Sequence, residues 1–166
     1  NHQKYESIII QEGTHGIEDI RIREFILLNM QICYEDIDDN FVNILLSSSK
    51  KKNLEYEKKQ KILYTIIIDG ILVGLFAYTH KRGGALKVSP LLLVPEFRTK
   101  ELIIIIVNQI VNDLESNNRR KVIIIQPLID WNIIQVFIEM DFIFEGVLRE
   151  PYKPGYDFAV FSYFKK

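Results

Sequence analysis

Hydrophobic and polar positions follow two different periods along the chain, and each change of period marks a predicted element. Residues 5–11 have the pattern of a first strand. The next pattern has helical spacing and predicts an amphipathic helix from Ile17 to about Tyr34. Its predicted apolar stripe consists of Ile20, Phe25, Leu28 and Ile32. Residues 38–40 offer N-caps for a second helix that carries Phe41, Ile44 and Leu45, and the polar residues 47–60 then predict a solvated loop or helix end.

The middle of the chain predicts an antiparallel meander. A run at residues 62–68 ends at Asp69-Gly70, a two-residue hairpin signal, and a second run at 71–79 follows directly. Arg82-Gly83-Gly84 turns into a third run at 85–94. Because proline cannot donate to a strand ladder, Ser89-Pro90 predicts a bulge in this third strand.

After Pro95 the pattern returns to helical spacing. An apolar stripe that continues to Leu114 predicts a helix packed on the sheet, and Asn117-Asn118 ends it. Residues 122–125 are uniformly apolar, which predicts a strand buried on both faces. A helix at 130–140 and a closing antiparallel pair at 142–149 and 155–164 complete the chain.

This order of elements predicts an α+β fold. A meander followed by a strand–helix–strand crossover gives a mixed sheet of about seven strands, mostly antiparallel with a central parallel pair, flanked by about four helices. The length predicts a single domain over residues 1–166. A crevice is expected where the parallel pair begins, and an edge strand such as 155–164 could pair across a homodimer.

Composition narrows the classes of function. With 21 Lys and Arg against 22 Asp and Glu, the chain has no global basic field, so we expect neither a nucleic-acid partner nor binding to a membrane surface. The isoleucine runs are far shorter than the roughly 20 residues of a membrane span. One cysteine allows neither an internal disulfide nor a thiolate metal cage, and no metal is expected. A cytoplasmic protein is the default expectation.

Two segments resemble the GNAT superfamily of N-acetyltransferases. Residues 93–103, with Pro95, Glu96, Phe97, Arg98 and Lys100, are similar to the V-x-P-E-[YF]-R-G-K-G-[IL]-G run that closes a strand and opens the cofactor helix of the family. Residues 130–142 resemble the next family helix, where Asp130 and Phe137 take the Asn and Tyr places. The ending 145–150 with 155–157 resembles the branch that acetylates protein N-termini, the ribosomal-protein type.

The resemblance implies a binding site for acetyl-CoA or coenzyme A. Free amides and the positive dipole end of a helix would bind the diphosphate, and the preceding strand would bind the pantetheine arm through its backbone. The implied cofactor-binding residues are Leu93, Val94, Arg98, Thr99, Lys100, Glu101, Leu102, Ile103, Asp130 and Phe137. Tyr152 and Tyr156 are candidates for the pocket of the acceptor amine.

The chain also departs from the family pattern. Thr99, Glu101 and Ile103 stand where glycine, or alanine at the third place, is usual. Phe137 at the tyrosine place removes the usual proton donor to the leaving thiolate, and the strand at 85–94 offers no carboxylate or histidine as base. His80 is a more natural exposed turn residue than a catalyst. The sequence therefore identifies no catalytic set.

Three hypotheses remain open. The first is an acetyl-CoA-dependent N-acetyltransferase acting on an amine of a small molecule or a peptide. The second is a non-catalytic relative that keeps the fold as a binding or assembly module, with weak or no binding of coenzyme A. The third is an unrelated α+β domain. The first is preferred because transfer to an amine tolerates the loss of a single acid or base, each worth about 10²–10⁴-fold.

Overall fold

The computed structural model describes residues 5–14, 16–48 and 61–166, which form one seven-stranded sheet flanked by helices. The strands are β1 (Ile8–Glu12), β2 (Lys61–Ile68), β3 (Ile71–Lys81), β4 (Ala85–Leu93), β5 (Lys121–Pro127), β6 (Ile143–Leu148) and β7 (Phe158–Phe164). The helices are α1 (Asp19–Met30), α2 (Asp39–Ser48), the 3-10 turn η1 (Pro95–Phe97), α3 (Lys100–Ser116) and α4 (Trp131–Glu139).

The strands follow the order β1-β2-β3-β4-β5-β7-β6. Within the described residues β4 and β5 are parallel, and every other neighbouring pair is antiparallel. The helix α3 makes the crossover between the two parallel strands, as a parallel connection requires. The predicted fold class, a mixed α+β sheet with a central parallel pair, is confirmed.

Local signals in the sequence explain several of the boundaries. Asp69 and Gly70 have φ of 48° and 82°, the positive values that a two-residue hairpin turn between β2 and β3 requires. At the start of α2, Asp38 Oδ1 accepts a hydrogen bond from the Phe41 amide at 3.0 Å. The predicted hairpin and the predicted helix cap are therefore confirmed.

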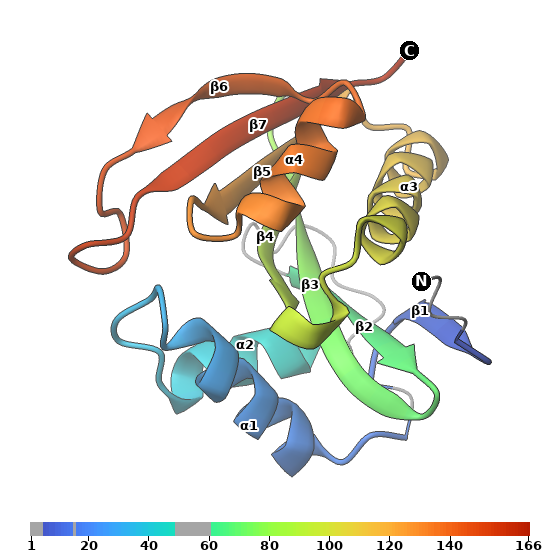
Figure 1. The fold of residues 1–166 in the computed structure, drawn as a ribbon, viewed down its shortest axis with the longest axis vertical. Coiled ribbons are helices and arrows are strands. Elements are labelled where there is room, and N and C mark those ends of the chain that lie inside the picture. Colours follow the sequence, from blue (N-terminus) through green and yellow to red (C-terminus); the bar gives the residue numbers. More distant parts are fainter. Residues whose placement is uncertain (1–4, 15, 49–60) are drawn as a thin grey trace.

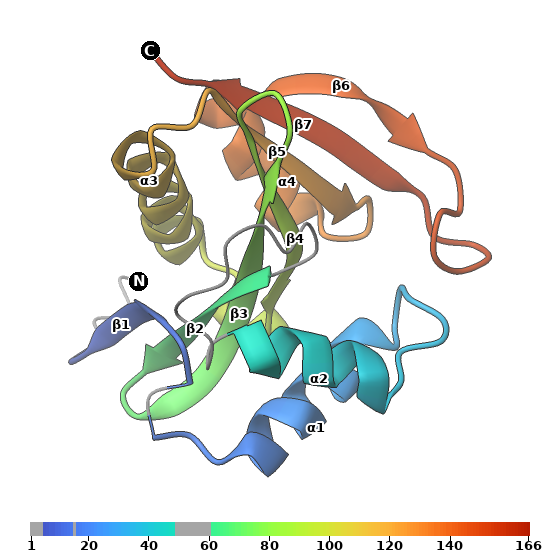
Figure 2. The same ribbon diagram turned by 180° about the vertical axis from the view of Figure 1, so that it is seen from behind.

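Two apolar cores lie on opposite faces of the sheet. The larger core joins the sheet to α3 and α4, and the smaller one joins β2, β3 and β4 to α1 and α2. Figure 1 shows α3 and α4 together over one half of the molecule and α1 and α2 together in the other half. Seen from behind, no helix of the described chain covers β5, β7 and β6 (Figure 2).

The buried side of α1 differs from the prediction. Three residues of the expected stripe are exposed, namely Ile20, Leu28 and Ile32, with exposed fractions of 57%, 74% and 50%. The buried stripe consists instead of Ile22, Ile26 and Met30. These residues are spaced four apart, so they lie on one side of the helix. Apolar residues surround most of α1, and spacing alone therefore could not select the buried side.

Two predictions about the C-terminal strands are wrong. Ile123 and Ile125 of β5 are only partly buried, whereas Val122 and Ile124 are buried, so β5 is buried on one face and not on both. The reason is that α3 and α4 cover one face of this half of the sheet. The strand at 155–164 is not an edge strand either, because β7 lies between β5 and β6.

The predicted loop at 47–60 falls mostly on residues 49–60, which lie outside the described residues. Among the helices that the structure describes, none has the length and apolar character needed to cross a membrane.

Candidate active site

The two parallel strands separate halfway along their length. Their ladder runs from Ala85↔Lys121 to Val88↔Ile124 and goes no further, although β4 continues to Leu93 and β5 to Pro127. On its other side β4 changes register against β3 at the same level, where Val88 pairs with Tyr78 and Leu91 with Phe76. Ser89 and Pro90 form this irregularity, which confirms the predicted bulge. The bulge therefore lies where the opening between β4 and β5 begins.

Two residues of β4 direct their backbone N–H and C=O groups toward this opening. The Val94 amide donates to Val73 O on β3 at 2.9 Å, and successive strand residues direct their backbone groups to opposite sides. Leu91 and Leu93 therefore direct theirs toward β5. Both of their carbonyls accept side-chain hydrogen bonds, from Gln126 Nε2 at 3.3 Å and from Arg98 Nε at 2.8 Å.

A chain of three polar side chains spans the opening. Gln126 Nε2 of β5 also donates to Asp130 Oδ2 at 2.8 Å, and Asp130 Oδ1 lies 3.1 Å from Arg98 Nη1. Gln126 is fully buried, and its Oε1 has no hydrogen-bond partner in the described structure. Burial raises the pKa of Asp130, while Arg98 and Gln126 act in the opposite direction. The chain ties β5 and α4 to the turn that follows β4.

The start of α3 accommodates the three residues that replace glycine. Thr99 is the N-cap, and its Oγ1 accepts a hydrogen bond from the Leu102 amide at 3.3 Å. The side chain of Glu101 is exposed, and Ile103 is buried in the larger core. In the first turn of a helix the amides have no partner within the helix, so those of Lys100 and Glu101 remain as donors.

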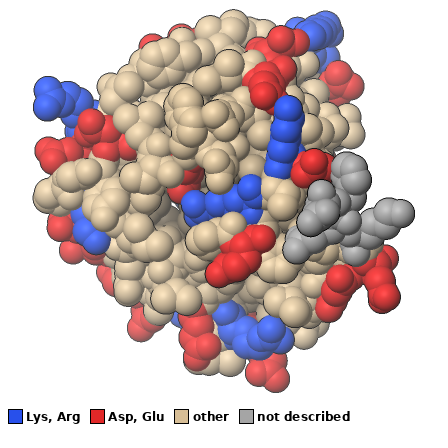
Figure 3. All heavy atoms as spheres, viewed as in Figure 1, with Lys and Arg blue, Asp and Glu red and all other residues tan. Residues whose placement is uncertain are grey.

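A hollow of about 230 Å³ lies beside this helix start. It is lined by Arg98 and Lys100 on one side and by Asn132, Gln135, Val136 and Glu139 of α4 on the other. Lys100 Nζ and Glu139 Oε2 form an ion pair of 2.9 Å at this hollow. In the space-filling view, positively charged side chains border a depression near the middle of this face (Figure 3). The hollow therefore has two cations at a helix start, and each is paired with a carboxylate, Arg98 with Asp130 and Lys100 with Glu139. Cations beside a helix start can bind an anion that displaces these carboxylates.

Aromatic side chains line the other side of the opening. Tyr34, which follows α1, stacks on Tyr152 at 5.0 Å between ring centroids, and both rings contact Phe158 edge-on. Burial raises the pKa of Tyr34, while the nearby Ser89 side chain acts in the opposite direction. The Glu35 amide donates to Tyr152 O at 2.8 Å, which joins the α1–α2 loop to the β6–β7 loop.

The structure brings most of the predicted site residues together. Arg98 and Lys100 line the hollow, and Thr99 and Glu101 belong to the same helix start. Leu93 and Asp130 contact Arg98 at the opening, and Tyr152 lies on the aromatic side. The side chains of Leu102, Ile103 and Phe137 lie in the core, where Phe137 stacks on Phe142, and Val94 is partly buried against that core. Tyr156 lies in the β6–β7 loop with Lys153 Nζ 5.6 Å from its ring centroid.

Other residues were missed or lie elsewhere. Tyr34, Ser89 and Gln126 were not predicted as site residues, although Gln126 is a polar residue directly after an uninterrupted apolar run. His80 pairs with Leu86, at the closed end of the β4–β5 pair, and so lies away from the opening. In the described part of the chain, no three His, Cys, Asp or Glu side chains gather closely enough to hold a metal ion.

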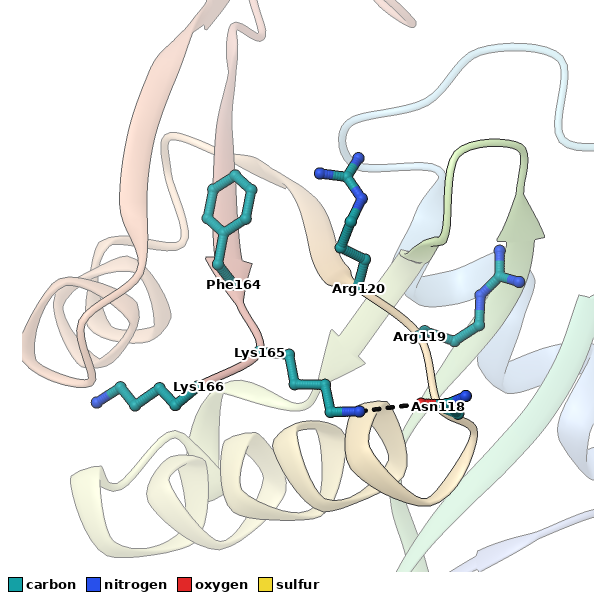
Figure 4. Close-up of a pocket in the computed structure, with 6 residues that line it drawn as sticks. All are labelled: Asn118, Arg119, Arg120, Phe164, Lys165 and Lys166. Atoms are coloured by element: carbon teal, nitrogen blue, oxygen red, sulfur yellow. Dashed lines mark hydrogen bonds between the residues drawn. The ribbon is translucent and has the colours of Figure 1, made fainter.

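A second hollow, of about 380 Å³, lies at the opposite end of β5. Its lining residues are Asn118, Arg119, Arg120, Phe164, Lys165 and Lys166. The four cations point in different directions, and Lys165 Nζ donates to Asn118 Oδ1 at 3.0 Å (Figure 4). Arg119 Nη2 donates to the carbonyls of Lys81 and Ala85. These contacts brace the ends of the strands and give no convergent site.

Comparisons with known proteins identify the fold. No family model and no curated protein matches the sequence. Solved structures do match over nearly the whole length of both chains. Spermidine N-acetyltransferase from Vibrio cholerae, in complex with CoA and spermine, has a TM-score of 0.72 at 13% identity and covers 95% of each chain. This chain has the GNAT fold.

Two further structures with the GNAT fold agree. The aminoglycoside 6'-N-acetyltransferase from Enterococcus faecium has a TM-score of 0.68 at 12% identity, with 95% of this chain and 97% of that chain covered. A GNAT family acetyltransferase from Elizabethkingia anophelis with acetyl-CoA bound has a TM-score of 0.65 at 10% identity, with 96% and 99% covered. The hypothesis of an unrelated fold is therefore wrong.

Proposed function

We propose that the protein is an acyl-CoA-dependent N-acetyltransferase that transfers an acetyl group from acetyl-CoA to an amine. The observation that carries the proposal is the combination of two features at one place. The parallel strands β4 and β5 separate after Val88, and the free amides of α3 lie beside that opening with Arg98 and Lys100. In this proposal the diphosphate binds at the helix start, and the extended arm lies between the separated strands.

The residues that replace glycine are compatible with this use. Thr99 caps the helix, the side chain of Glu101 is exposed to solvent, and Ile103 is buried in the core. The cost of Glu101 is therefore that of an exposed like charge near a diphosphate, about 1 kcal/mol at contact distance. Arg98 and Lys100 offset it with two positive charges.

The acceptor is an amine of a small molecule or a peptide that enters from the side of Tyr34 and Tyr152. Two stacked rings form a flat apolar wall there, beside the point where β4 leaves β5. Solved proteins with this fold act on amines, as the names of the spermidine and aminoglycoside enzymes state. Attack of the amine on the thioester requires orientation and removal of protons.

Finer parts of the prediction belong to the same proposal. They are a single catalytic domain over residues 1–166, a cytoplasmic location, and a likeness to the enzymes that acetylate protein N-termini. The segments that carry this last likeness form the end of β6 and the β6–β7 loop, next to Tyr152. A peptide N-terminus is therefore one acceptor to include in the assay.

A second candidate function is a binding module without catalysis. It is favoured by the bonds that already occupy the opening, since Gln126 and Arg98 take the carbonyls of Leu91 and Leu93. In this state, the backbone carbonyls that would accept hydrogen bonds from a pantetheine arm are already bonded to side chains of the protein.

One experiment separates the two functions. The melting temperature is measured with and without acetyl-CoA, and thiol release is then followed with a panel of amines and peptides. A ligand at 100 times its dissociation constant stabilises by about 2.7 kcal/mol, which is several degrees for a domain of this size. A shift together with thiol release supports the transferase. A shift without thiol release on any amine supports the module, and the absence of a shift contradicts coenzyme A binding.

A further inference from the structure

A lysine side chain reaches the point where β4 and β5 begin to separate. Lys61 is the first residue of β2, and its Nζ donates to Ser89 O at 3.0 Å and lies 3.4 Å from Thr79 Oγ1. Ser89 is the first residue of β4 beyond the last pair of the parallel ladder, Val88↔Ile124. The amine of Lys61 therefore lies at the closed end of the opening.

The face of the sheet follows from the alternation along β2. Lys61 is two residues from Leu63, which packs in the core with α1 and α2, so both side chains lie on that face. This is also the side of Tyr34, which packs against the same core and lies near the Ser89 side chain. Lys61 and Tyr34 thus meet at the same residue, on the side where the proposed acceptor enters.

The surroundings of Lys61 disfavour its charged form. Among the described residues, the charged groups that lower its pKa are two further cations, Lys87 of β4 and Lys81 of β3. The packed helix α2 has one charged residue, Asp39, in its first turn, and no carboxylate pairs with Lys61 among the described residues. Burial, followed by the effects of Lys87 and Lys81, lowers the pKa of Lys61 to about 8. A lysine in this state can exchange a proton near neutral pH.

We propose that Lys61 is the general base of the transfer reaction and takes a proton from the ammonium group of the acceptor. The inference rests on the proposed function and names the base that was not found in β4. In this scheme the neutral Lys61 amine accepts one proton of the ammonium and passes it to solvent. The amine nitrogen then forms the new C–N bond with the acetyl carbon, the C–S bond breaks, and the second nitrogen proton goes to the leaving thiolate.

Two substitutions distinguish a base from a structural residue. Lys61→Arg keeps the positive charge and the donors to Ser89 O, but a guanidinium cannot lose its proton in this range. Lys61→Met keeps the length of the stem and removes both the charge and the base. If Lys61 is the base, both variants lower kcat/KM by about 10²–10⁴-fold and lose the limb of the pH–rate profile near pH 8. Binding of acetyl-CoA stays within about twofold of wild type, because neither variant alters the hollow beside α3.

A measurement without catalysis tests the same group. The side-chain carbon and proton signals of the lysines are followed by NMR through a pH titration of the wild-type protein. One lysine should titrate near pH 8, and its signal should be absent in Lys61→Arg. Titration of Lys61 near the ordinary lysine value would overturn the inference.

The outcomes are separable from failure of the proposed function. If Lys61→Arg retains wild-type kcat/KM and the wild-type pH profile, Lys61 is not the base, and the transferase proposal is untouched. If the wild-type protein binds no acetyl-CoA or releases no thiol with any amine, both proposals fail together.

Discussion

The ion pair between Lys100 and Glu139 allows a direct test of where the diphosphate binds. Lys100 Nζ and Glu139 Oε2 are 2.9 Å apart, and both side chains are more than half exposed. Glu139 is also the carboxylate among the described lining residues of the hollow beside α3. Glu139→Gln should therefore release Lys100 for the ligand and remove a negative charge from the site, without changing the shape of α4.

The expected magnitude follows from the exposure of the pair. An exposed ion pair contributes about 0.2–1 kcal/mol. In Glu139→Gln the diphosphate no longer has to break a pair of this strength in order to bind Lys100. The repulsion between an exposed carboxylate and the ligand is of similar size. A gain of about 1 kcal/mol corresponds to about fivefold tighter binding of coenzyme A. The free energy of unfolding should change by less than about 1 kcal/mol.

Isothermal titration calorimetry at low and at high salt measures the effect. Glu115→Gln is the matched control, because it removes the same charge from an exposed residue near the other end of α3, about 20 Å away. The gain for Glu139→Gln should exceed that for the control and should shrink at high salt, since exposed charges are screened. Equal effects of the two substitutions, or none for Glu139→Gln, would refute the placement of the diphosphate in this hollow.

Three other predictions concern the same region and the partly buried Lys61. Glu101→Gly should strengthen binding of coenzyme A in calorimetry although it costs α3 roughly 1 kcal/mol, and weaker binding would contradict the placement of the helix start. Arg98→Met leaves the Asp130 carboxylate buried without its cation and should lower the free energy of unfolding, measured in urea, by about 3–5 kcal/mol. The second substitution Asp130→Asn should recover part of this loss. A loss below about 1 kcal/mol for Arg98→Met would contradict a stabilising Arg98–Asp130 pair. The lowered pKa of Lys61, from 10.5 to about 8, means that the unfolded chain binds more protons between these values, so stability should rise with pH across that interval. Relative to Lys61→Met the rise should be on the order of 2 kcal/mol, and parallel pH curves for the two proteins would contradict the lowered pKa of Lys61 in the folded protein.

The sequence could predict those parts of the fold that depend on local chemistry. The Asp69-Gly70 turn follows from backbone conformations that few residues adopt, and the central parallel pair follows from the helical crossover between its two strands. The position of β7 between β5 and β6 was not predicted. The buried face of α1 could not be predicted, because its apolar residues surround most of the helix. Burial of β5 on both faces was expected from composition. The structure differs because the helices cover one face of that half of the sheet.

The sequence could predict only the part of the candidate site that comes from one continuous segment. Residues 93–103 form a strand end, a turn and a helix start in one continuous run, so their pattern is visible in the sequence. The polar chain through Gln126, Asp130 and Arg98 joins β5, the residue before α4 and the turn after β4. Tyr34 and Lys61 reach Ser89 from two further elements. Contacts of this kind depend on tertiary packing, and no local spacing reveals them.

The structure changes how strongly each departure from the family pattern is expected to affect binding of coenzyme A. The missing glycines matter less at the start of α3, because the Glu101 side chain is exposed and Ile103 is buried in the core, although Thr99 takes the Leu102 amide as its helix cap. The stronger obstacle lies in the opening itself, where Gln126 and Arg98 hold the carbonyls that an incoming pantetheine arm would use. Arg98 lies both in this chain and at the edge of the hollow, so an anion bound there competes with Asp130 for the guanidinium. Leu93 O is held by the Nε atom and Asp130 by Nη1, so Leu93 O becomes free for the arm only if the whole guanidinium moves toward the bound diphosphate.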